Sequence, residues 1–154
     1  IEPSPRALKC LRKNTNGYDN IQIIPCGVWN QSEDLELRFG VSPADDSLIE
    51  PDDGGNGELK TVQVHSIDEI ATMEGLDEID YVKIEAEGVE LEALQGIREV
   101  DVKKIAVSGN EERFGESSYN ESAEILRKRN YMVEIDDDHP YKMVYAHKNE
   151  NTNN

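Results

Sequence analysis

Short apolar runs that alternate with helical patterns constrain the fold of this 154-residue chain most strongly. The runs "TVQVH" at 61–65, "IDYVKI" at 79–84 and "KIAV" at 104–107 have the length and composition of strands. Between them, apolar residues recur every three or four positions, as they do in amphipathic helices. We therefore predict an α/β fold with a mostly parallel sheet that helices cover on both faces.

Local signals mark where several helices begin and end. Ser4 followed by Pro5 is a typical pair of N-cap and first-turn residues. Ser66 and Glu69 have the spacing of a capping box. Asn130 can end the last helix in a left-handed conformation. Helices are therefore predicted over residues 4–14, 87–97 and 120–130, with a short one that opens at Ser66.

The other segments predict two strands, a loop and a hairpin. "IQII" at 21–24 is typical of a short buried strand, and "LELRF" at 35–39 alternates like a half-exposed one. Residues 41–60 combine proline, glycine and acidic residues, which favours a mobile loop without the residue order of a calcium site. "YMVEI" at 131–135 and "YKMVYAH" at 141–147 predict a C-terminal antiparallel hairpin.

The balance of charge limits the classes of partner. The chain has 33 acidic and 16 basic residues, hence a formal net charge of −17 at pH 7. Such a surface repels phosphate backbones, so we expect no nucleic-acid partner. It suits a salt-rich cytoplasm, where the screening length falls to about 3 Å at 1 M; an acidic protein from an ordinary cytoplasm is the alternative. No run approaches the roughly 20 apolar residues of a membrane span, and we expect a cytoplasmic protein.

The length of the chain fits one domain, which we place at residues 1–148, followed by a disordered tail at 149–154. Cys10 and Cys26 have neither the spacing of a metal site nor the number needed for a disulfide framework, so two unpaired thiols are expected. The three histidines are isolated in sequence from one another and from the cysteines. The pattern therefore predicts no metal site.

Several side chains with chemical potential directly follow predicted strands. Glu2 follows the residue that looks like the end of a strand, Cys26 and Gly27 come shortly after "IQII", and Glu85 follows "YVKI". In parallel sheets, ligands bind beyond the carboxyl ends of the strands. An acidic residue at the end of the second strand of a nucleotide-binding fold accepts hydrogen bonds from ribose hydroxyls. Glu2 fits that role, and a solvated glutamate before a helix is the alternative.

The stretch "YVKIEAEGVE" concentrates charge where a strand ends. Lys83 and Glu85 share one face of the strand about 7 Å apart, and a lysine in such a strand is costly to bury unless it is paired. Near the start of the next helix the macrodipole stabilises an anion by roughly 0.3–1 kcal/mol, which suffices to explain Glu90. Lys83, Glu85 and Glu87 are therefore candidate site residues.

The same stretch carries a family resemblance. "VKIEAEGVELEALQGI" resembles the signature of FkbM-type methyltransferases, Lys-Ile-Asp-x-Glu-Gly-x-Glu followed by Leu and a later Gly. "IEPSPRALKCLRKN" is similar to the second strand and helix of that family, and "NIQIIPCGVWNQSEDLEL" to its third strand and following hairpin. "VQVHSIDEI" matches its Val-x-Val-x-x-Leu-Asp-x-Leu segment. The resemblance covers about residues 1 to 135, with the segments in the family's order.

The resemblance implies a Rossmann-like methyltransferase that uses S-adenosylmethionine, usually to methylate hydroxyl oxygens of sugars or natural products. Glu2 would hold the ribose of that cofactor. Cys26, Gly27 and Val28 would lie against the adenine, and Glu85 would sit near the methionine end. The implied partner is a small-molecule or glycan acceptor, and association into a homo-oligomer stays open.

Catalysis in such a family depends on positioning and on a base within hydrogen-bond reach of the acceptor hydroxyl. Lys83, Glu85 and Glu87 are the candidates for that pocket. Two departures from the family pattern stand out: Glu85 replaces Asp, and residues 108–110, "SGN", replace the common Glu-x-His. The alternatives are a methyltransferase-like domain that serves as a non-catalytic binding or assembly module, and another nucleotide-binding enzyme of similar fold.

The family's strand order also predicts a gap in the sheet. A first strand, with its glycine-rich loop, would lie between the strand that ends at Ile1 and the strand at 79–84. Without it, inner strands would leave backbone groups unpaired at roughly 1–3 kcal/mol each, so residues 1–154 alone should not hold the complete fold as a monomer. We therefore expect either a segment upstream of Ile1 or a gap that a rearranged strand or a neighbouring chain fills.

Overall fold

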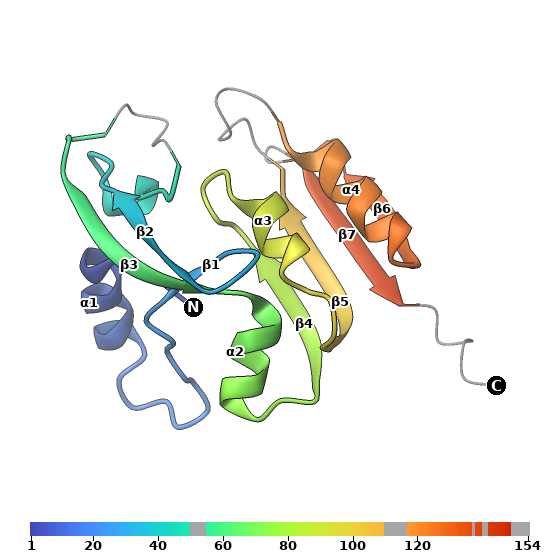
Figure 1. The fold of residues 1–154 in the computed structure, drawn as a ribbon, viewed down its shortest axis with the longest axis horizontal. Helices are drawn as coiled ribbons and strands as arrows, with labels where there is room; N and C mark the ends of the chain where they lie inside the picture. The colour runs from blue at the N-terminus through green and yellow to red at the C-terminus, as the bar shows by residue number, and fades with distance from the viewer. Residues whose placement is uncertain (50–54, 110–116, 137, 140–141, 149–154) are drawn as a thin grey trace.

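The computed structural model describes residues 1–49, 55–109, 117–136, 138–139 and 142–148, and places their strands in two sheets (Figure 1). The three-stranded sheet has the order β1 (Gly27–Val28), β3 (Leu59–His65) and β2 (Glu33–Arg38). The four-stranded sheet has the order β4 (Glu78–Ile84), β5 (Asp101–Ser108), β7 (Met143–Lys148) and β6 (Tyr131–Asp136). The helices are α1 (Pro5–Asn14), α2 (Ile67–Glu74), α3 (Glu90–Gln95), α4 (Tyr119–Lys128) and the short 3-10 helix η1 (Pro43–Asp45).

Both sheets are mixed. β1 runs parallel to β3 and β4 runs parallel to β5, whereas β2 pairs antiparallel with β3, and β7 pairs antiparallel with β5 and with β6. The prediction of one mostly parallel sheet is therefore wrong, because β2 and β7 each add antiparallel ladders. The α/β class and the C-terminal antiparallel hairpin are confirmed.

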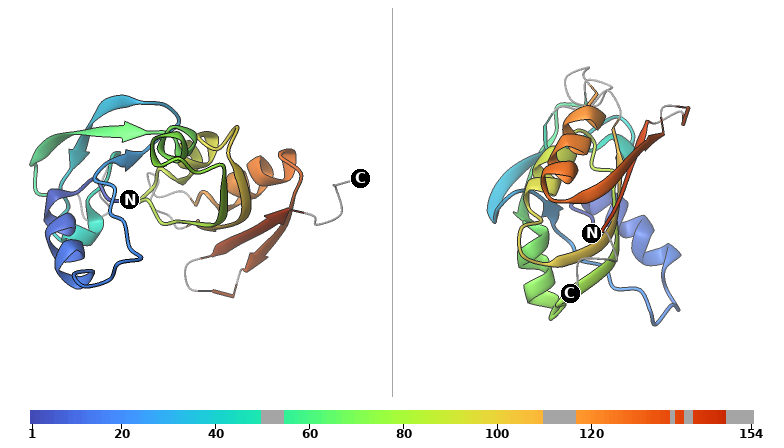
Figure 2. Two further views of the ribbon diagram at one scale, coloured as in Figure 1. Left: turned by 90° about the horizontal axis from the view of Figure 1, so that it is seen from below. Right: turned by 90° about the vertical axis from the view of Figure 1, so that its right-hand side faces the viewer.

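Helices cover one face of the four-stranded sheet. In Figure 2, α4 lies against that face, while α1 lies on the opposite side of the molecule beneath the three-stranded sheet. The other face of the four-stranded sheet exposes Tyr81, Met132 and Tyr145, so the prediction of helices on both faces does not hold for this sheet in the described part of the chain. Buried side chains of β5, α3 and α4 form the main core: Val102, Ile105, Val107, Ala93, Leu94, Ala123 and Leu126.

Three of the predicted helix ends are confirmed by their local geometry, whereas the helix predicted over residues 87–97 is shorter, because α3 spans only Glu90–Gln95. The Ser4 hydroxyl accepts the N–H of Ala7, and Pro5 begins α1. Ser66 and Glu69 form both halves of a capping box at the start of α2. Asn130 follows α4 with a φ of 63°, in the left-handed region.

The predicted strand at 21–24 is not formed. Ile21 is exposed, and Ile23 and Ile24 are only half-buried. The segment lies beside the start of the chain, where the N–H of Glu2 donates to the carbonyl of Ile24 at 3.1 Å. The prediction fails because a strand needs a ladder of such hydrogen bonds, whereas the described residues form a single hydrogen bond across this contact.

The segment predicted as a loop, residues 41–60, contains more regular structure than expected, including η1. Residues 43–49 have defined partners, since Ser47 and Arg38 form a β-bridge with N–H to carbonyl distances of 2.8 and 3.0 Å. Leu59 and Lys60 belong to β3. Residues 50–54 of the predicted loop and the predicted tail at 149–154 lie outside the described residues.

The two sheets are separated at the position where the sequence predicts a gap. β4 pairs with β5 along one edge and, among the residues that the structure describes, with no strand along the other. Ile1 and β1 lie across from that edge (Figure 1). None of the described segments fills the space as a rearranged strand.

Asp68, in the first turn of α2, forms hydrogen bonds to the segment between α3 and β5. Its N–H donates to the carbonyl of Gly96 at 3.2 Å. Its carboxylate accepts the backbone N–H groups of Arg98, Glu99 and Val100 at 2.9, 3.1 and 3.0 Å. The start of α2 is therefore fixed to the segment that leads into β5.

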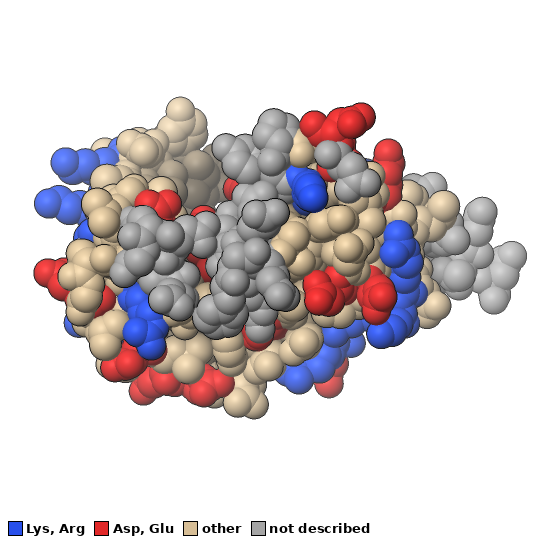
Figure 3. Space-filling view, turned by 90° about the horizontal axis from the view of Figure 1, so that it is seen from above, with Lys and Arg blue, Asp and Glu red and all other residues tan. Residues whose placement is uncertain are grey.

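The surface mixes both signs of charge. Figure 3 shows acidic side chains in scattered groups on one face, with lysine and arginine side chains among them. Lys103 bridges Glu78 and Asp80 at 2.9 Å each, which raises the pKa of Lys103 and lowers that of Asp80. In the described ranges, no helix is long and apolar enough to cross a membrane.

Candidate functional site

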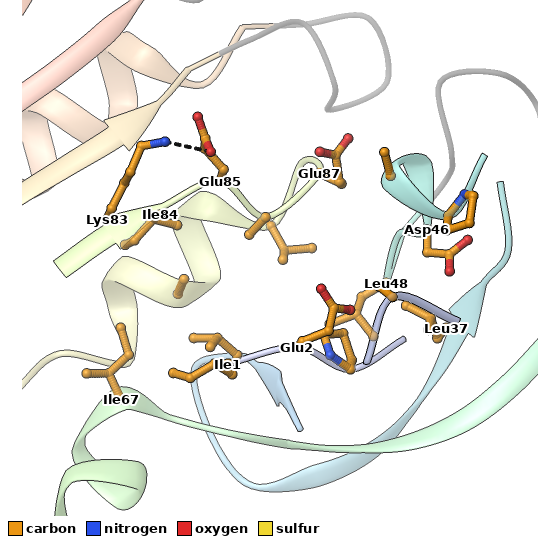
Figure 4. Close-up of a pocket in the computed structure, with 18 of the residues that line it drawn as sticks. Ile1, Glu2, Leu37, Asp46, Leu48, Ile67, Lys83, Ile84, Glu85 and Glu87 are labelled. Atoms are coloured by element: carbon orange, nitrogen blue, oxygen red, sulfur yellow. Dashed lines mark ion pairs between the residues drawn. The ribbon is translucent and has the colours of Figure 1, made fainter. Parts of the chain in front are cut away.

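A cavity of about 500 Å³ lies between the two sheets. This volume falls within the range of small-molecule sites, roughly 300–1,000 Å³. The cavity reaches from the unpaired edge of β4 to the start of the chain, with Val82 and Ile84 on one side and Ile1 and Val28 on the other. Its charged lining comes from Glu2, Asp46, Lys83, Glu85 and Glu87 (Figure 4).

Glu2 lies at the entrance to α1. Its carboxylate accepts the N–H of Ser4 at 2.7 Å, and its own N–H is bonded to Ile24. Partial burial raises the pKa of Glu2, and the hydrogen bond from Ser4 lowers it by less. A half-buried carboxylate with one protein donor has further lone pairs that can accept hydrogen bonds from hydroxyl groups of a ligand.

Lys83 and Glu85 form an ion pair at the end of β4. The Nζ and Oε2 atoms are 2.6 Å apart, and the two side chains are 49% and 52% exposed. The pair lies at the cavity, as Figure 4 shows. The two residues share one face of the strand as predicted, but Lys83 is not buried, so the cost of burying a lysine does not apply here. Water screens the pair because both side chains are half-exposed.

The turn after β4 carries Glu87. The φ angles of Glu87 and Gly88 are 48° and 93°, so both residues are left-handed. The carboxylate of Glu90 accepts the N–H groups of Ala86 and Gly88 at 2.9 and 3.2 Å. Glu90 is buried, with 1% of its surface exposed. Glu90 therefore organises this turn, a role more specific than the effect of the helix dipole alone.

Asp46 also lines the cavity, although no motif in the sequence indicated it. Its side chain, 2% exposed, accepts hydrogen bonds from the Ser4 hydroxyl, the Arg6 guanidinium and, at 3.0 Å, the N–H of Gly40. Arg6 also lies 4.6 Å from the centre of the Phe39 ring. Asp46 is thus an anchor between α1 and the loop at η1.

The structure brings most of the predicted site residues together. Cys26 and Gly27 are the exceptions, because both are buried outside the cavity lining. Burial raises the pKa of the Cys26 thiol. A Cβ on Gly27 would come within 2.8 Å of Val64, so this residue is packed against β3. The predicted residues that do line the cavity are Glu2, Val28, Lys83, Glu85 and Glu87.

The residues at the end of β5 and directly after it lie elsewhere. Ser108 is buried and does not line the cavity. Gly109 packs against Tyr119, where an added Cβ would lie 2.3 Å from the Cβ of that residue. Asn110 is outside the described residues. The departure from Glu-x-His therefore stays a sequence observation.

The residues that line the cavity indicate which kind of ligand it suits. Four carboxylates and one ammonium group line the cavity, and Arg6 neutralises one of the carboxylates, that of Asp46. Apolar side chains form the rest of the wall. The arrangement favours a ligand with an apolar body, hydroxyl groups and positive charge.

Comparison with known protein families identifies the family of the chain. The family model described as the Methyltransferase FkbM domain matches residues 1–133, from the first residue of the chain into β6. No curated protein and no solved structure matches the chain.

Proposed function

The chain belongs to the FkbM methyltransferase family, and from this premise we propose that it transfers a methyl group from S-adenosylmethionine to a hydroxyl oxygen of a sugar or another small molecule. The observation that carries the proposal is the cavity between the sheets, with its apolar walls and its carboxylates. The same cavity contains five of the residues that the family resemblance indicates.

The residues present fit this methyl donor. S-adenosylmethionine combines an adenine ring, a ribose with two hydroxyls, and positive charge on its sulfonium and ammonium groups. Val28 and Val82 offer apolar surface to the ring, and Glu2 offers a carboxylate to the hydroxyls. Glu85 and Glu87 supply the negative charge that complements a cation. When bound, the donor would supply an electrophilic methyl group.

Positioning is the main task of the chain's own residues, because methyl transfer is an in-line displacement. Glu2 would fix the ribose through hydrogen bonds to a charged acceptor, each worth about 1.5–3 kcal/mol. Val28 lines the cavity and can contact the adenine as proposed. Cys26 and Gly27 do not line the cavity, so they would act only by packing behind Val28.

The acceptor hydroxyl must also lose a proton. Glu85 and Glu87 are the carboxylates within the cavity that could take it, and the ion pair with Lys83 would orient Glu85. The variant Glu85→Gln distinguishes between these two candidate bases. Loss of turnover with intact donor binding assigns the role of the base to Glu85. Unchanged turnover leaves Glu87 as the base. Turnover can be followed as S-adenosylhomocysteine released in the presence of a panel of sugars.

A calorimetric titration of the full-length protein with S-adenosylmethionine tests the proposal, at high salt because of the acidic surface. We expect saturable binding of one donor molecule per chain. Absence of binding would overturn the proposal and favour the alternative, a methyltransferase-like module that does not catalyse.

A further inference from the structure

Glu90 is a buried carboxylate that accepts hydrogen bonds from the backbone of the turn after β4. One of its carboxylate oxygens, Oε1, accepts the N–H of Ala86 at 2.9 Å and the N–H of Gly88 at 3.2 Å. Buried carboxylates are costly unless they are well hydrogen-bonded. These two bonds enclose Glu87, whose side chain lines the cavity. The orientation of Glu87 therefore depends on a residue that does not itself line the cavity.

The backbone between the two donors is one that needs support. Glu87 has a φ of 48°, in a region that L-residues other than glycine rarely occupy. Left-handed non-glycine residues persist where the surrounding structure holds them. The two bonds to Glu90 provide that restraint on the side of α3.

Ser47 holds the same turn from the other sheet. Its hydroxyl donates to the carbonyl oxygen of Glu87 at 2.7 Å and accepts the N–H of Ile49 at 3.1 Å. Its backbone pairs with Arg38 of β2, and only 2% of its surface is exposed. The bond from Ser47 to Glu87 thus joins the loop that follows β2 to the turn that follows β4, beside the cavity that separates the sheets.

We infer that Glu90 and Ser47 are positioning residues for the methyl-donor site: together they hold the turn at 86–88 so that the Glu85 and Glu87 carboxylates face the sulfonium charge of the donor. The inference rests on the proposed function for the identity of the ligand. The hydrogen bonds on which it is built do not depend on that identity.

The test compares two variants with matched controls. Glu90→Gln replaces the charged acceptor of the Ala86 and Gly88 N–H groups with a neutral amide. Ser47→Ala removes the hydrogen bond to the Glu87 carbonyl. Glu121→Gln removes an exposed carboxylate from the first turn of α4, and Ser32→Ala removes an exposed hydroxyl just before β2, away from the cavity lining. Calorimetry measures the affinities of all five proteins for S-adenosylmethionine and for S-adenosylhomocysteine, which lacks the sulfonium charge.

Glu90→Gln and Ser47→Ala should each weaken S-adenosylmethionine binding about tenfold, the effect of one lost bond to a charged group, and S-adenosylhomocysteine binding much less. The controls should bind both ligands like the unaltered protein. Equal losses for the two ligands, or no loss, would overturn the inference, because a merely structural role does not distinguish ligands by charge. If Glu90→Gln does not fold, the Ser47→Ala result decides.

Amide hydrogen exchange separates this inference from the proposed function. If the unaltered protein binds neither ligand, the proposed function fails, and exchange at the amides of Ala86 and Gly88 decides whether the turn is held as described. Faster exchange at both amides in Glu90→Gln and Ser47→Ala supports the restraint. Unchanged exchange refutes it.

Discussion

Replacing Asp68 with alanine should destabilise the protein more than most changes of a partly exposed side chain. The carboxylate accepts three consecutive backbone N–H groups, those of Arg98, Glu99 and Val100, at 2.9 to 3.1 Å. It thereby joins the start of α2, which follows the three-stranded sheet, to the segment that enters β5. Asp68→Ala removes all three bonds and leaves the donors in place.

The size of the effect follows from the surroundings of each donor. Arg98 and Glu99 are exposed, so water can replace the carboxylate and each loss costs about 0.5–1 kcal/mol. Val100 is half-buried, and its unsatisfied N–H costs about 1–2 kcal/mol. The free energy of unfolding should therefore fall by about 3 kcal/mol, which lowers the melting temperature of a domain of this size by about 6–12 °C.

Thermal and urea unfolding followed by circular dichroism measure this change. Glu74→Ala is the matched control, because Glu74 also lies on α2 and its carboxylate accepts a hydrogen bond from the exposed side-chain amide of Gln22. The control should melt within about 0.5 kcal/mol of the unaltered protein. A loss below about 1 kcal/mol for Asp68→Ala would refute the role given to these three bonds.

Three further predictions concern charge, packing and capping. The net charge of −17 should give a higher melting temperature in multimolar than in dilute potassium chloride, and equal midpoints would contradict the high-salt interpretation. Gly96→Ala should cost about 1–3 kcal/mol in urea unfolding, because its Cβ would lie 2.5 Å from the carbonyl oxygen of Trp29; full stability would show that the backbone yields. Ser66→Ala should cost about 0.5–2 kcal/mol at pH 7. That cost should shrink as the pH falls from 4.5 to about 2, because hydrogen bonds from Ser66 lower the pKa of Glu69 to about 2; a constant cost would refute the coupling.

The sign of the pH effect follows from the direction of the shift. The pKa of Glu69 is lower in the folded protein than its ordinary value of 4.5, so ionised Glu69 stabilises the fold above that pH. The contribution disappears as the carboxylate is protonated. Urea unfolding of both proteins across this pH window measures it.

Features of the fold that depend on neighbours in sequence were predictable. The N-cap at Ser4, the capping box of Ser66 with Glu69 and the left-handed Asn130 each depend on residues within one helical turn. The pair of Lys83 and Glu85 depends on the two-residue repeat of a strand. Such signals are local, so a single sequence contains them.

Contacts between distant segments were not predictable from the sequence. Asp46 and Ser47 lie in a segment whose composition favours a mobile loop, yet they bond to Arg6 and Glu87, each 40 residues away along the chain. The same limit applies to the sheets: the pairing of β2 with β3 depends on tertiary contacts that the alternation of strands and helices does not specify. For the site, the sequence indicated the carboxylates of Glu2, Glu85 and Glu87, but neither Asp46 nor the residues that hold the turn after β4.

The decisive measurement is the affinity of the unaltered protein and of Glu2→Ala for S-adenosylmethionine, determined by calorimetry at high salt. Glu2 lines the cavity and has one hydrogen bond from Ser4, so its carboxylate can accept further bonds from the ribose. We predict that Glu2→Ala weakens binding by about 1.5–3 kcal/mol, the value of hydrogen bonds to a charged group, while the protein stays folded. Equal affinities for the two proteins would contradict the placement of the methyl donor in this cavity with its ribose at Glu2.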